Sequence, residues 1–276
     1  MELLQPSSLE ELDTAGPGLL LAGGTDVVPI IRNRLIDIDT LVDIRSVVPR
    51  GIDGTTFGGG TTLAELEVDP EIPAALREAC ASAASPQLRA MGSIGGNLRQ
   101  ATRCWYWRMK FPCYLHGGDR CYAQTGMHRE HSVFANDRTA SAHPSDPAAA
   151  LIALGATIRT NRRELPVAEL YRLPTEDDRD VTTLEPGELI LELEVPQSEA
   201  STYLKAMDRR RWSFPLVGVA AARGTNGTRL VLAGVAPIPW VLDSPDALEE
   251  ATPLPGTAYK VEIARALVRR ALGAVA

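Results

Sequence analysis

Two glycine-rich turns, each preceded by an apolar run, constrain the fold of this chain more than any other feature. The first is Ala22-Gly23-Gly24-Thr25-Asp26 and the second is Gly92-Ser93-Ile94-Gly95-Gly96-Asn97. Glycine pairs accept backbone angles that are closed to other residues and place no Cβ in the way of a ligand. Successive N–H groups in such turns can converge on an anion. The turns are either tight connections between strands and helices, or two grips on one phosphate-bearing cofactor such as a dinucleotide.

The size and charge of the chain exclude several classes of protein. Its 276 residues are enough for one large domain or two to three small ones. Its formal net charge of −7 argues against non-specific binding of nucleic acid. No apolar run reaches the length of a membrane span, and the N-terminal residues lack the pattern of a secretory signal. We therefore expect a cytoplasmic protein whose cysteines are thiols or metal ligands rather than disulfides.

The apolar pattern predicts three units along the chain. Residues 1–50 are expected to form a small α/β unit, and residues 51–172 a second unit. Within the second unit, residues 102–140 hold many aromatic residues and few aliphatic repeats, which predicts an irregular Cys-rich loop. The polar stretch at 173–187 is the best candidate for a linker. Residues 188–276 are expected to form a C-terminal α+β unit.

Hydrophobic periodicity places the first glycine turn inside a βαβ unit, between a strand at 19–22 and a helix at 27–34, with a second strand at 40–44. Asn226-Gly227 is a strong signal for a hairpin in the C-terminal unit. The other predicted elements are helices at 7–12, 63–66, 71–83, 146–154 and 259–272, and strands at 156–163, 190–195, 217–222 and 229–235.

Three of the four cysteines, Cys104, Cys113 and Cys121, lie close together in the Cys-rich loop. Thiolates bind soft metals and iron–sulfur clusters. The spacings are wider than in the cysteine pairs of zinc ribbons, and they suit a loop around a larger cluster. Two alternatives stay open: three unrelated thiols, or zinc bound by cysteine and a nearby histidine. The fourth cysteine, Cys80, is interpreted as a small buried apolar side chain. The candidate histidines are His116, His128 and His131.

Two further polar features carry candidate chemistry. Asp146 follows His143-Pro144-Ser145 at the start of a predicted helix, where it can cap the helix or accept a ribose hydroxyl. The basic run at 205–211 is either a solvated surface or a source of positive charge for a phosphate or a negative ring. Its cations are Lys205, Arg209, Arg210 and Arg211.

Taken together, these segments resemble the FAD-binding medium subunit of the molybdenum hydroxylases, the family of xanthine dehydrogenase and carbon monoxide dehydrogenase. The resemblance is carried by both glycine turns, by His143-Pro144-Ser145-Asp146, by Lys205 and Arg209 before Phe214-Pro215-Leu216-Val217, by Gly234-Val235-Ala236-Pro237, and by Ala258-Tyr259-Lys260-Val261-Glu262. It implies an α+β fold of three subdomains, with FAD between the first two and its pyrophosphate against both turns. It also implies that Asp146 and the basic run approach the ribityl or flavin end, where Lys205 would favour the anionic reduced ring.

The segment Thr102-Arg103-Cys104-Trp105-Tyr106-Trp107-Arg108 narrows the resemblance to the flavin subunits of bacterial aldehyde oxidoreductase and 4-hydroxybenzoyl-CoA reductase. Those subunits carry an extra [4Fe-4S] cluster. By resemblance, Cys104, Cys113 and Cys121 match three of its four ligands. The fourth position is Thr139, where this chain departs from the pattern. This departure leaves three alternatives open. The cluster is lost, it is held by three cysteines, or it recruits another group as a ligand, such as Asp137 or Cys80.

The resemblance implies an FAD-dependent oxidoreductase that passes electrons from iron–sulfur centres to an external acceptor. Its partners would be a large subunit with a molybdenum cofactor and a small [2Fe-2S] subunit. One alternative is a free-standing flavoenzyme that oxidises a small molecule directly at its FAD. Another is a non-enzymatic, cysteine-rich binding or assembly module. A partner-bound subunit is expected to expose a sizeable apolar patch.

Overall fold

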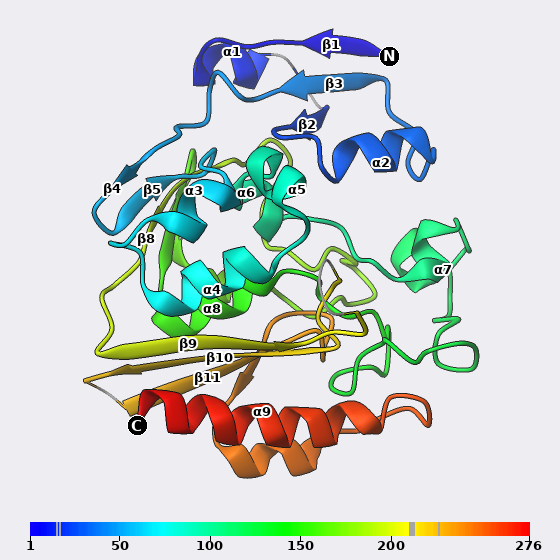
Figure 1. Ribbon diagram of the computed structural model, residues 1–276. Coiled ribbons are helices and arrows are strands. Elements are labelled where there is room, and N and C mark those ends of the chain that lie inside the picture. Colours follow the sequence, from blue (N-terminus) through cyan, green and yellow to red (C-terminus); the bar gives the residue numbers. More distant parts are fainter. Residues whose placement is uncertain (15, 17, 210–212, 226) are drawn as a thin grey trace.

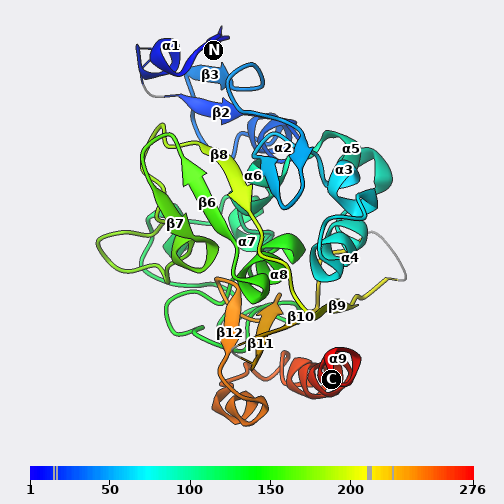
Figure 2. The same cartoon turned by 90° about the vertical axis from the view of Figure 1, so that its left-hand side faces the viewer.

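Three β-sheets follow one another along the molecule in the computed structural model, which describes residues 1–14, 16, 18–209, 213–225 and 227–276. A small sheet lies at one end, a five-stranded sheet lies in the middle, and a four-stranded sheet covered by the C-terminal helix lies at the other end (Figures 1 and 2). Three residues singled out in the sequence lie outside the described ranges: Arg210, Arg211 and Asn226.

The first sheet is parallel and has the order β1 (Glu2–Leu4), β3 (Thr40–Asp43), β2 (Leu19–Leu21). The helix α2 (Val27–Arg32) connects β2 to β3, which confirms the predicted βαβ unit. The helix α1 (Leu9–Thr14) connects β1 to β2. The first glycine turn therefore lies at the carboxyl end of a parallel strand, where α/β folds commonly bind ligands.

The middle sheet is antiparallel and combines strands that are distant in the sequence. Its order is β4 (Ile52–Asp53), β5 (Thr56–Gly58), β8 (Ile190–Glu194), β6 (Thr157–Thr160), β7 (Glu164–Pro166). The strand β8 was expected in the C-terminal unit, but its backbone pairs with β5 and β6. The sheet pairing therefore favours a boundary after β8, and the division into three units stays a prediction.

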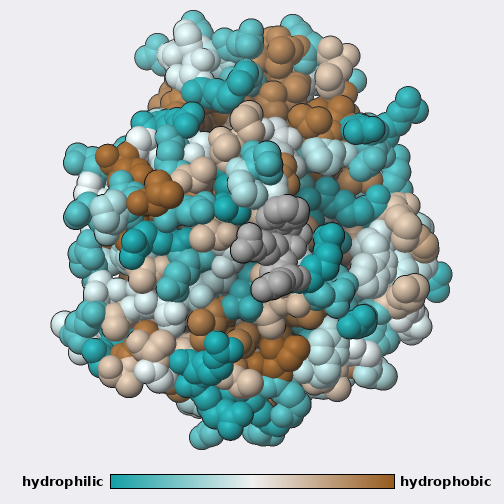
Figure 3. Space-filling model, viewed as in Figure 1, coloured by the Kyte–Doolittle hydropathy of each residue, from teal (hydrophilic) through white to brown (hydrophobic). Residues whose placement is uncertain are grey.

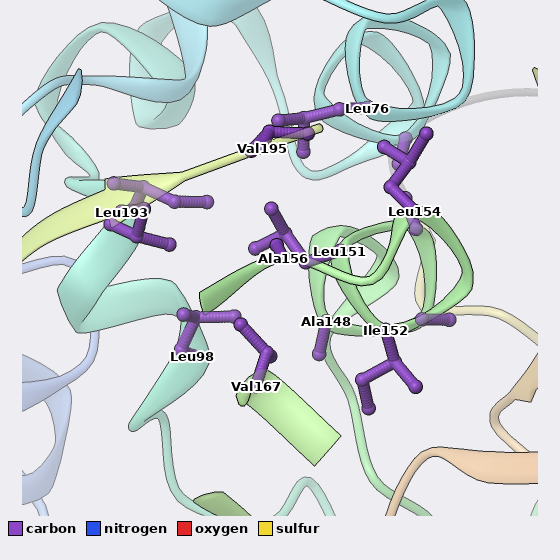
Figure 4. Close-up of a cluster of buried hydrophobic side chains, with 14 of the residues drawn as sticks. Leu76, Leu98, Ala148, Leu151, Ile152, Leu154, Ala156, Val167, Leu193 and Val195 are labelled. Atoms are coloured by element: carbon purple, nitrogen blue, oxygen red, sulfur yellow. The ribbon is translucent and has the colours of Figure 1, made fainter. Parts of the chain in front are cut away.

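Five helices lie beside this sheet, and α4 and α8 also pack against the four-stranded sheet. They are α3 (Leu63–Val68), α4 (Ala74–Ser82), α5 (Pro86–Met91), α6 (Ile94–Leu98) and α8 (Asp146–Leu154). All nine residues of α8 are buried, which explains why its sequence is apolar on every side. The close-up in Figure 4 shows its leucines against α4, α6 and β8, so one core joins these elements. The residues labelled there are Leu76, Leu98, Ala148, Leu151, Ile152, Leu154, Ala156, Val167, Leu193 and Val195.

The third sheet is an antiparallel meander with the order β12 (Trp240–Leu242), β11 (Gly227–Ala233), β10 (Val217–Gly224), β9 (Ala200–Ala206). The helix α9 (Tyr259–Val275) covers one face of it (Figure 1). The predicted strands at 217–222 and 229–235 are confirmed as β10 and β11. The sequence analysis did not identify β9, which contains Lys205.

The Cys-rich loop at 102–140 is irregular, as predicted, and lies beside the sheets (Figure 1, green). The predicted linker at 173–187 is tied to this loop, because Arg179 donates hydrogen bonds to the carbonyls of Tyr114 and Gly118 at 2.8 and 2.6 Å. The remaining short helices are α7 (Trp105–Arg108), η1 (Tyr114–His116), η2 (Val167–Leu170) and η3 (Pro245–Glu250). None of the helices within the described ranges is both long and apolar enough to cross a lipid bilayer.

Candidate functional site

Both glycine turns line one cavity of about 740 Å³ between the first sheet and the helices that follow it in sequence. This volume lies within the range of cavities that enclose a small molecule or cofactor. Its wall also includes Leu184, Glu185, Pro186 and Gly187 from the predicted linker. The predicted site residues that line it are Ala22, Gly23, Gly24, Thr25, Asp26, Ser93, Gly95 and Gly96.

The two turns touch each other, and only glycine permits their approach. A Cβ on Gly23 would lie 1.7 Å from the carbonyl oxygen of Met91, which immediately precedes the second turn. A Cβ on Gly92 would lie 3.5 Å from the hydroxyl of Thr25. Two segments about seventy residues apart in sequence are therefore in contact and face a common cavity.

The backbone amides of the two turns differ in availability. Among the described residues, no acceptor is recorded for the N–H groups of residues 23–26. The second turn forms the start of α6, and several of its amides are already bonded: Ile94 donates to Thr61 at 2.8 Å and Gly95 to Gly59 at 2.9 Å. Among the described residues, no acceptor is recorded for the amide of Ser93, which lines the cavity. Gly96 donates to the Ser93 hydroxyl at 3.3 Å. The first turn therefore has more amides without a recorded acceptor than the second turn, and the expectation that amides of both turns converge on an anion stays a prediction.

A third glycine turn, Gly58-Gly59-Gly60, was not recognised as part of the site in the sequence analysis. Gly59 and Gly60 line the same cavity. A Cβ on Gly59 would lie 2.1 Å from the carbonyl oxygen of Ile190 in β8, so this turn also depends on the absence of a side chain. The run of three glycines before Thr61-Thr62 was the available signal. The partner of this turn is distant in sequence, because the Gly59 carbonyl accepts the amide of Gly95 in the second turn at 2.9 Å.

The carboxylate of Asp26 holds the first turn against the start of the Cys-rich loop. It accepts hydrogen bonds from the amide of Ala101 at 2.8 Å and from Arg108 at 2.9 Å, and it pairs with Arg103 at 2.8 Å. Asp26 therefore acts on the position of the turn through protein partners. Four other arginines line the cavity itself, each paired with a carboxylate: Arg45, Arg50, Arg99 and Arg162.

The remaining predicted site residues lie away from this wall. Within the described part of the chain, Gly92, Ile94, Asn97, Asp146 and Lys205 do not line the cavity. The Asn97 side chain instead accepts a hydrogen bond from the Ser145 hydroxyl at 2.6 Å, which connects α6 to the start of α8.

Asp146 and Lys205 form a buried ion pair, with both side chains only 3% exposed and Nζ 2.8 Å from the carboxylate. The Tyr203 hydroxyl also donates to Asp146. Burial and the Asp146 charge raise the pKa of Tyr203, which keeps the phenol protonated. The Lys205 charge is thus balanced inside the protein.

The three cysteines of the loop lie in one region, whereas Cys80 lies in the main core. Burial, together with the nearby Cys121 and Cys113, raises the pKa of the Cys104 thiol to about 11. Burial likewise raises the pKa of Cys113. In the residues that the structure describes, no three His, Cys, Asp or Glu side chains converge as ligands of a single metal ion.

Two of the three candidate histidines are occupied by backbone partners. The His116 ring stacks on Trp107 and its Nε2 lies 2.9 Å from the Trp107 carbonyl oxygen. His128 contacts the Ala123 carbonyl through Nδ1 and accepts the Gly256 amide at Nε2. Only His131 faces a cysteine, with Nε2 3.2 Å from Cys104 Sγ.

A second cavity, of about 370 Å³, lies beside the Cys-rich loop. Arg103 and Arg108 line it, and both also hold Asp26 of the first cavity. Cys104 and His131 form part of its wall. The two cavities are therefore separated by one layer of paired side chains, so the loop and the glycine turns form a continuous structural unit.

Comparisons with known proteins agree on one family. Residues 1–198 match the family model described as the FAD binding domain in molybdopterin dehydrogenase. The chain is 32% identical over 246 residues to the aldehyde oxidoreductase FAD-binding subunit PaoB of Escherichia coli, covering 82% of this chain and 77% of that subunit.

Solved structures give the same fold. A chain of carbon monoxide dehydrogenase from Hydrogenophaga pseudoflava matches with a TM-score of 0.69 at 22% identity, covering 100% of this chain and 96% of that one. A chain of quinoline 2-oxidoreductase from Pseudomonas putida 86 matches with a TM-score of 0.68 at 18% identity, with coverage of 100% and 96%. The predicted α+β fold of the carbon monoxide dehydrogenase flavoprotein type is thereby confirmed.

Proposed function

Because the chain belongs to the family of FAD-binding subunits of molybdenum hydroxylases, we propose that it passes electrons from iron–sulfur centres to an external acceptor through bound FAD. The family membership makes it an FAD-binding protein of an oxidoreductase family. One observation carries the proposal: residues 23–26, whose amides have no recorded acceptor among the described residues, line a cavity that is shared by three glycine turns.

The first turn would hold the diphosphate of FAD, since its amides have no recorded acceptor among the described residues. The second and third turns would keep the cavity open by leaving out side chains. The arginines at the wall, each already paired with a carboxylate, would add hydrogen-bond donors near the phosphates rather than net charge. When bound, FAD supplies the capacity to accept and release electrons, and the protein supplies its position and electrostatic surroundings. The roles of Asp146 and Lys205 at the flavin stay proposals.

We propose two partners, a large subunit with a molybdenum cofactor and a small [2Fe-2S] subunit. The support comes from the relative in E. coli, which is named as a subunit of an aldehyde oxidoreductase, and from neighbours that are chains of carbon monoxide dehydrogenase. The alternative is a free-standing flavoenzyme that oxidises a small molecule at its FAD. The two are separated by whether the chain co-purifies with molybdenum and [2Fe-2S] subunits from its native host.

We also propose a [4Fe-4S] cluster at Cys104, Cys113 and Cys121. The support is that one loop carries three thiols, of which Cys113 and Cys121 are buried and Cys104 is partly buried. In such a cluster each cysteine thiolate binds a different iron, so the thiolates do not meet at a single point. The loop starts at the wall of the flavin cavity, since Ala101 and Trp107 line that cavity. This position would suit electron transfer between a cluster and the flavin.

The flavin assignment is tested with Gly23→Ala. The new Cβ would clash with the Met91 carbonyl oxygen and push the two turns apart. We expect the variant to retain less than a tenth of the FAD of the wild-type chain, measured from flavin absorbance per chain after gel filtration. Gly273→Ala is the matched control, because a Cβ there meets nothing within 4 Å. Full flavin content in a folded Gly23→Ala variant would refute the assignment.

A further inference from the structure

The second cavity is separate from the one that the glycine turns share. Its volume is about 370 Å³, and segments that are distant in sequence form its wall. They are α2 and its end, the Cys-rich loop, the residues before α8 and the residues before β10. Within the described part of the chain, no residue of the three glycine turns lines it. It is therefore a candidate site for a small molecule other than FAD.

The wall of this cavity carries more positive than negative charge on its buried side. Arg103 Nη1 and Arg108 Nη2 both bind the same oxygen of Asp26, at 2.8 and 2.9 Å. Among the described residues, no other ion pair is recorded for either arginine. Two guanidinium groups thus share one carboxylate, which leaves one positive charge without a partner. The wall also includes an acid, Glu130, but this residue is exposed to solvent.

The same wall has hydrogen-bond donors that no described residue uses. His143 lines the cavity and is only 3% exposed. Its Nδ1 accepts the Ser145 amide at 3.4 Å, so the neutral ring carries its proton on Nε2, for which no acceptor is recorded among the described residues. Arg108 Nη1 likewise has no recorded acceptor there, and Arg103 Nε is buried without a partner. Since buried donors are rarely left unsatisfied, this wall points to a ligand that supplies acceptors.

Aromatic rings and prolines form much of the remaining wall. Phe214 is 46% exposed, and the centre of its ring lies 4.9 Å from Arg103 Cζ. The ring of Trp105 meets that of His131 edge-on, with centroids 4.6 Å apart. An exposed aromatic ring beside a cavity offers a flat apolar surface that a planar ligand can cover. The prolines are Pro29, Pro144 and Pro215.

We infer that this second cavity binds an aromatic carboxylate. The carboxylate accepts hydrogen bonds from His143 and Arg108 and balances the unpaired positive charge, and the aromatic ring lies against Phe214. A neutral aromatic molecule would leave the charge without a counterion, and a small anion without a ring would leave the aromatic surface uncovered. The inference goes beyond the proposed function, because it requires neither the flavin nor the cluster.

The test is isothermal titration calorimetry of the full chain, with FAD bound, against sodium benzoate. We expect one benzoate to bind per chain. Acetate keeps the charge without the ring, and benzyl alcohol keeps the ring without the charge. Each is expected to bind at least about tenfold more weakly than benzoate, because each lacks one of the two recognised groups. Absence of saturable benzoate binding to the wild-type chain would overturn the inference.

Two variants locate the bound benzoate. Phe214→Ala removes the exposed ring and is expected to weaken benzoate binding at least about fivefold. Its matched control is Val241→Ala, which truncates an apolar residue of similar exposure (49%) on β12, outside the cavity wall, and should bind benzoate as the wild type does. His143→Phe keeps a ring but lacks the Nε2 donor, and it is expected to weaken benzoate at least about fivefold while leaving benzyl alcohol unchanged.

Two further results would contradict the inference. One is wild-type affinity for benzoate in both Phe214→Ala and His143→Phe, which would place the ligand elsewhere. The other is benzoate binding only to chain from which FAD has been removed, which would place benzoate in the flavin cavity. FAD content is measured in the same samples, so a chain that binds benzoate but never FAD would contradict the proposed function and leave this inference standing.

Discussion

Lys205 and Asp146 show how a single buried pair can stabilise the junction of two layers. Lys205 comes from β9, and its Nζ donates to Asp146 at the start of α8 and to the carbonyl of Ser82 at the end of α4, at 2.8 and 2.9 Å. Removing one partner of a buried ion pair leaves the other charge without compensation, which costs far more than the pair itself contributes.

We therefore predict that Lys205→Met lowers the free energy of unfolding by about 3 kcal/mol, because the charge of Asp146 remains buried. Urea unfolding followed by circular dichroism measures the change. The double variant Lys205→Met/Asp146→Leu is the control, and we expect it to recover part of the loss because no charge stays behind. The opposite pattern, unchanged stability with an altered flavin reduction potential, would instead favour the role at the flavin that the family resemblance implies.

At the scale of elements, Lys260 fastens the C-terminal helix to the rest of the molecule. It lies on α9 and is fully buried, and its Nζ donates to three backbone carbonyls: Gly234 at 2.6 Å, His131 at 2.8 Å and Glu130 at 3.1 Å. Burial lowers the pKa of Lys260 to about 7. One side chain therefore joins α9, the end of β11 and the Cys-rich loop.

We predict that Lys260→Met destabilises the protein by about 3 kcal/mol, because three buried carbonyl oxygens lose their donor while the apolar stem is retained. The change is measured as the midpoint of urea unfolding. Arg270→Met, on the exposed side of the same helix, is the matched control and should change stability by less than about 0.5 kcal/mol. Equal stability of the two variants would show that the three hydrogen bonds contribute nothing.

Local signals in the sequence were sufficient for many of these elements. The apolar run of α8, the periodicity of α9 and the βαβ unit around the first glycine turn are all marked by adjacent residues. The place of β8 and the existence of β9 were missed because they depend on pairing with strands far away in sequence. The third glycine turn and the ion pair of Asp146 with Lys205 were missed for the same reason, because each depends on a contact with a residue that is distant in sequence.

At the scale of the whole molecule, one face offers partners a mixed surface. Figure 3 shows that apolar side chains on this face form several separate groups among polar ones. Interfaces between proteins that also exist apart are typically no more apolar than the rest of the surface. The sizeable apolar patch expected of a partner-bound subunit is therefore not what this face presents, and partner binding there would depend on polar contacts as well.

The acid stability of the whole molecule is expected to depend on His143. Its ring is buried against Tyr171 and accepts the Ser145 amide at Nδ1, and burial lowers its pKa from 6.5 to about 3. Between these values the unfolded chain binds a proton that the folded chain does not, so stability falls as the pH drops from 6.5 toward 3.

The variant His143→Phe retains an aromatic ring beside Tyr171 but has no group at this position that binds a proton, so the pH dependence of stability due to His143 is absent. We expect its unfolding free energy to fall less steeply with decreasing pH than that of the wild type, by up to about 1.4 kcal/mol per pH unit. Urea unfolding at intervals between pH 8 and pH 4 measures both slopes. At pH 8 the histidine is neutral in both the folded and the unfolded state. The difference in unfolding free energy between the variant and the wild type at this pH therefore reports only the change in packing and hydrogen bonding, and it serves as the control. If the unfolding free energies of the variant and the wild type fell equally steeply below pH 6.5, the folded protein would accommodate a proton on His143. The ring would then be less enclosed than its contacts indicate.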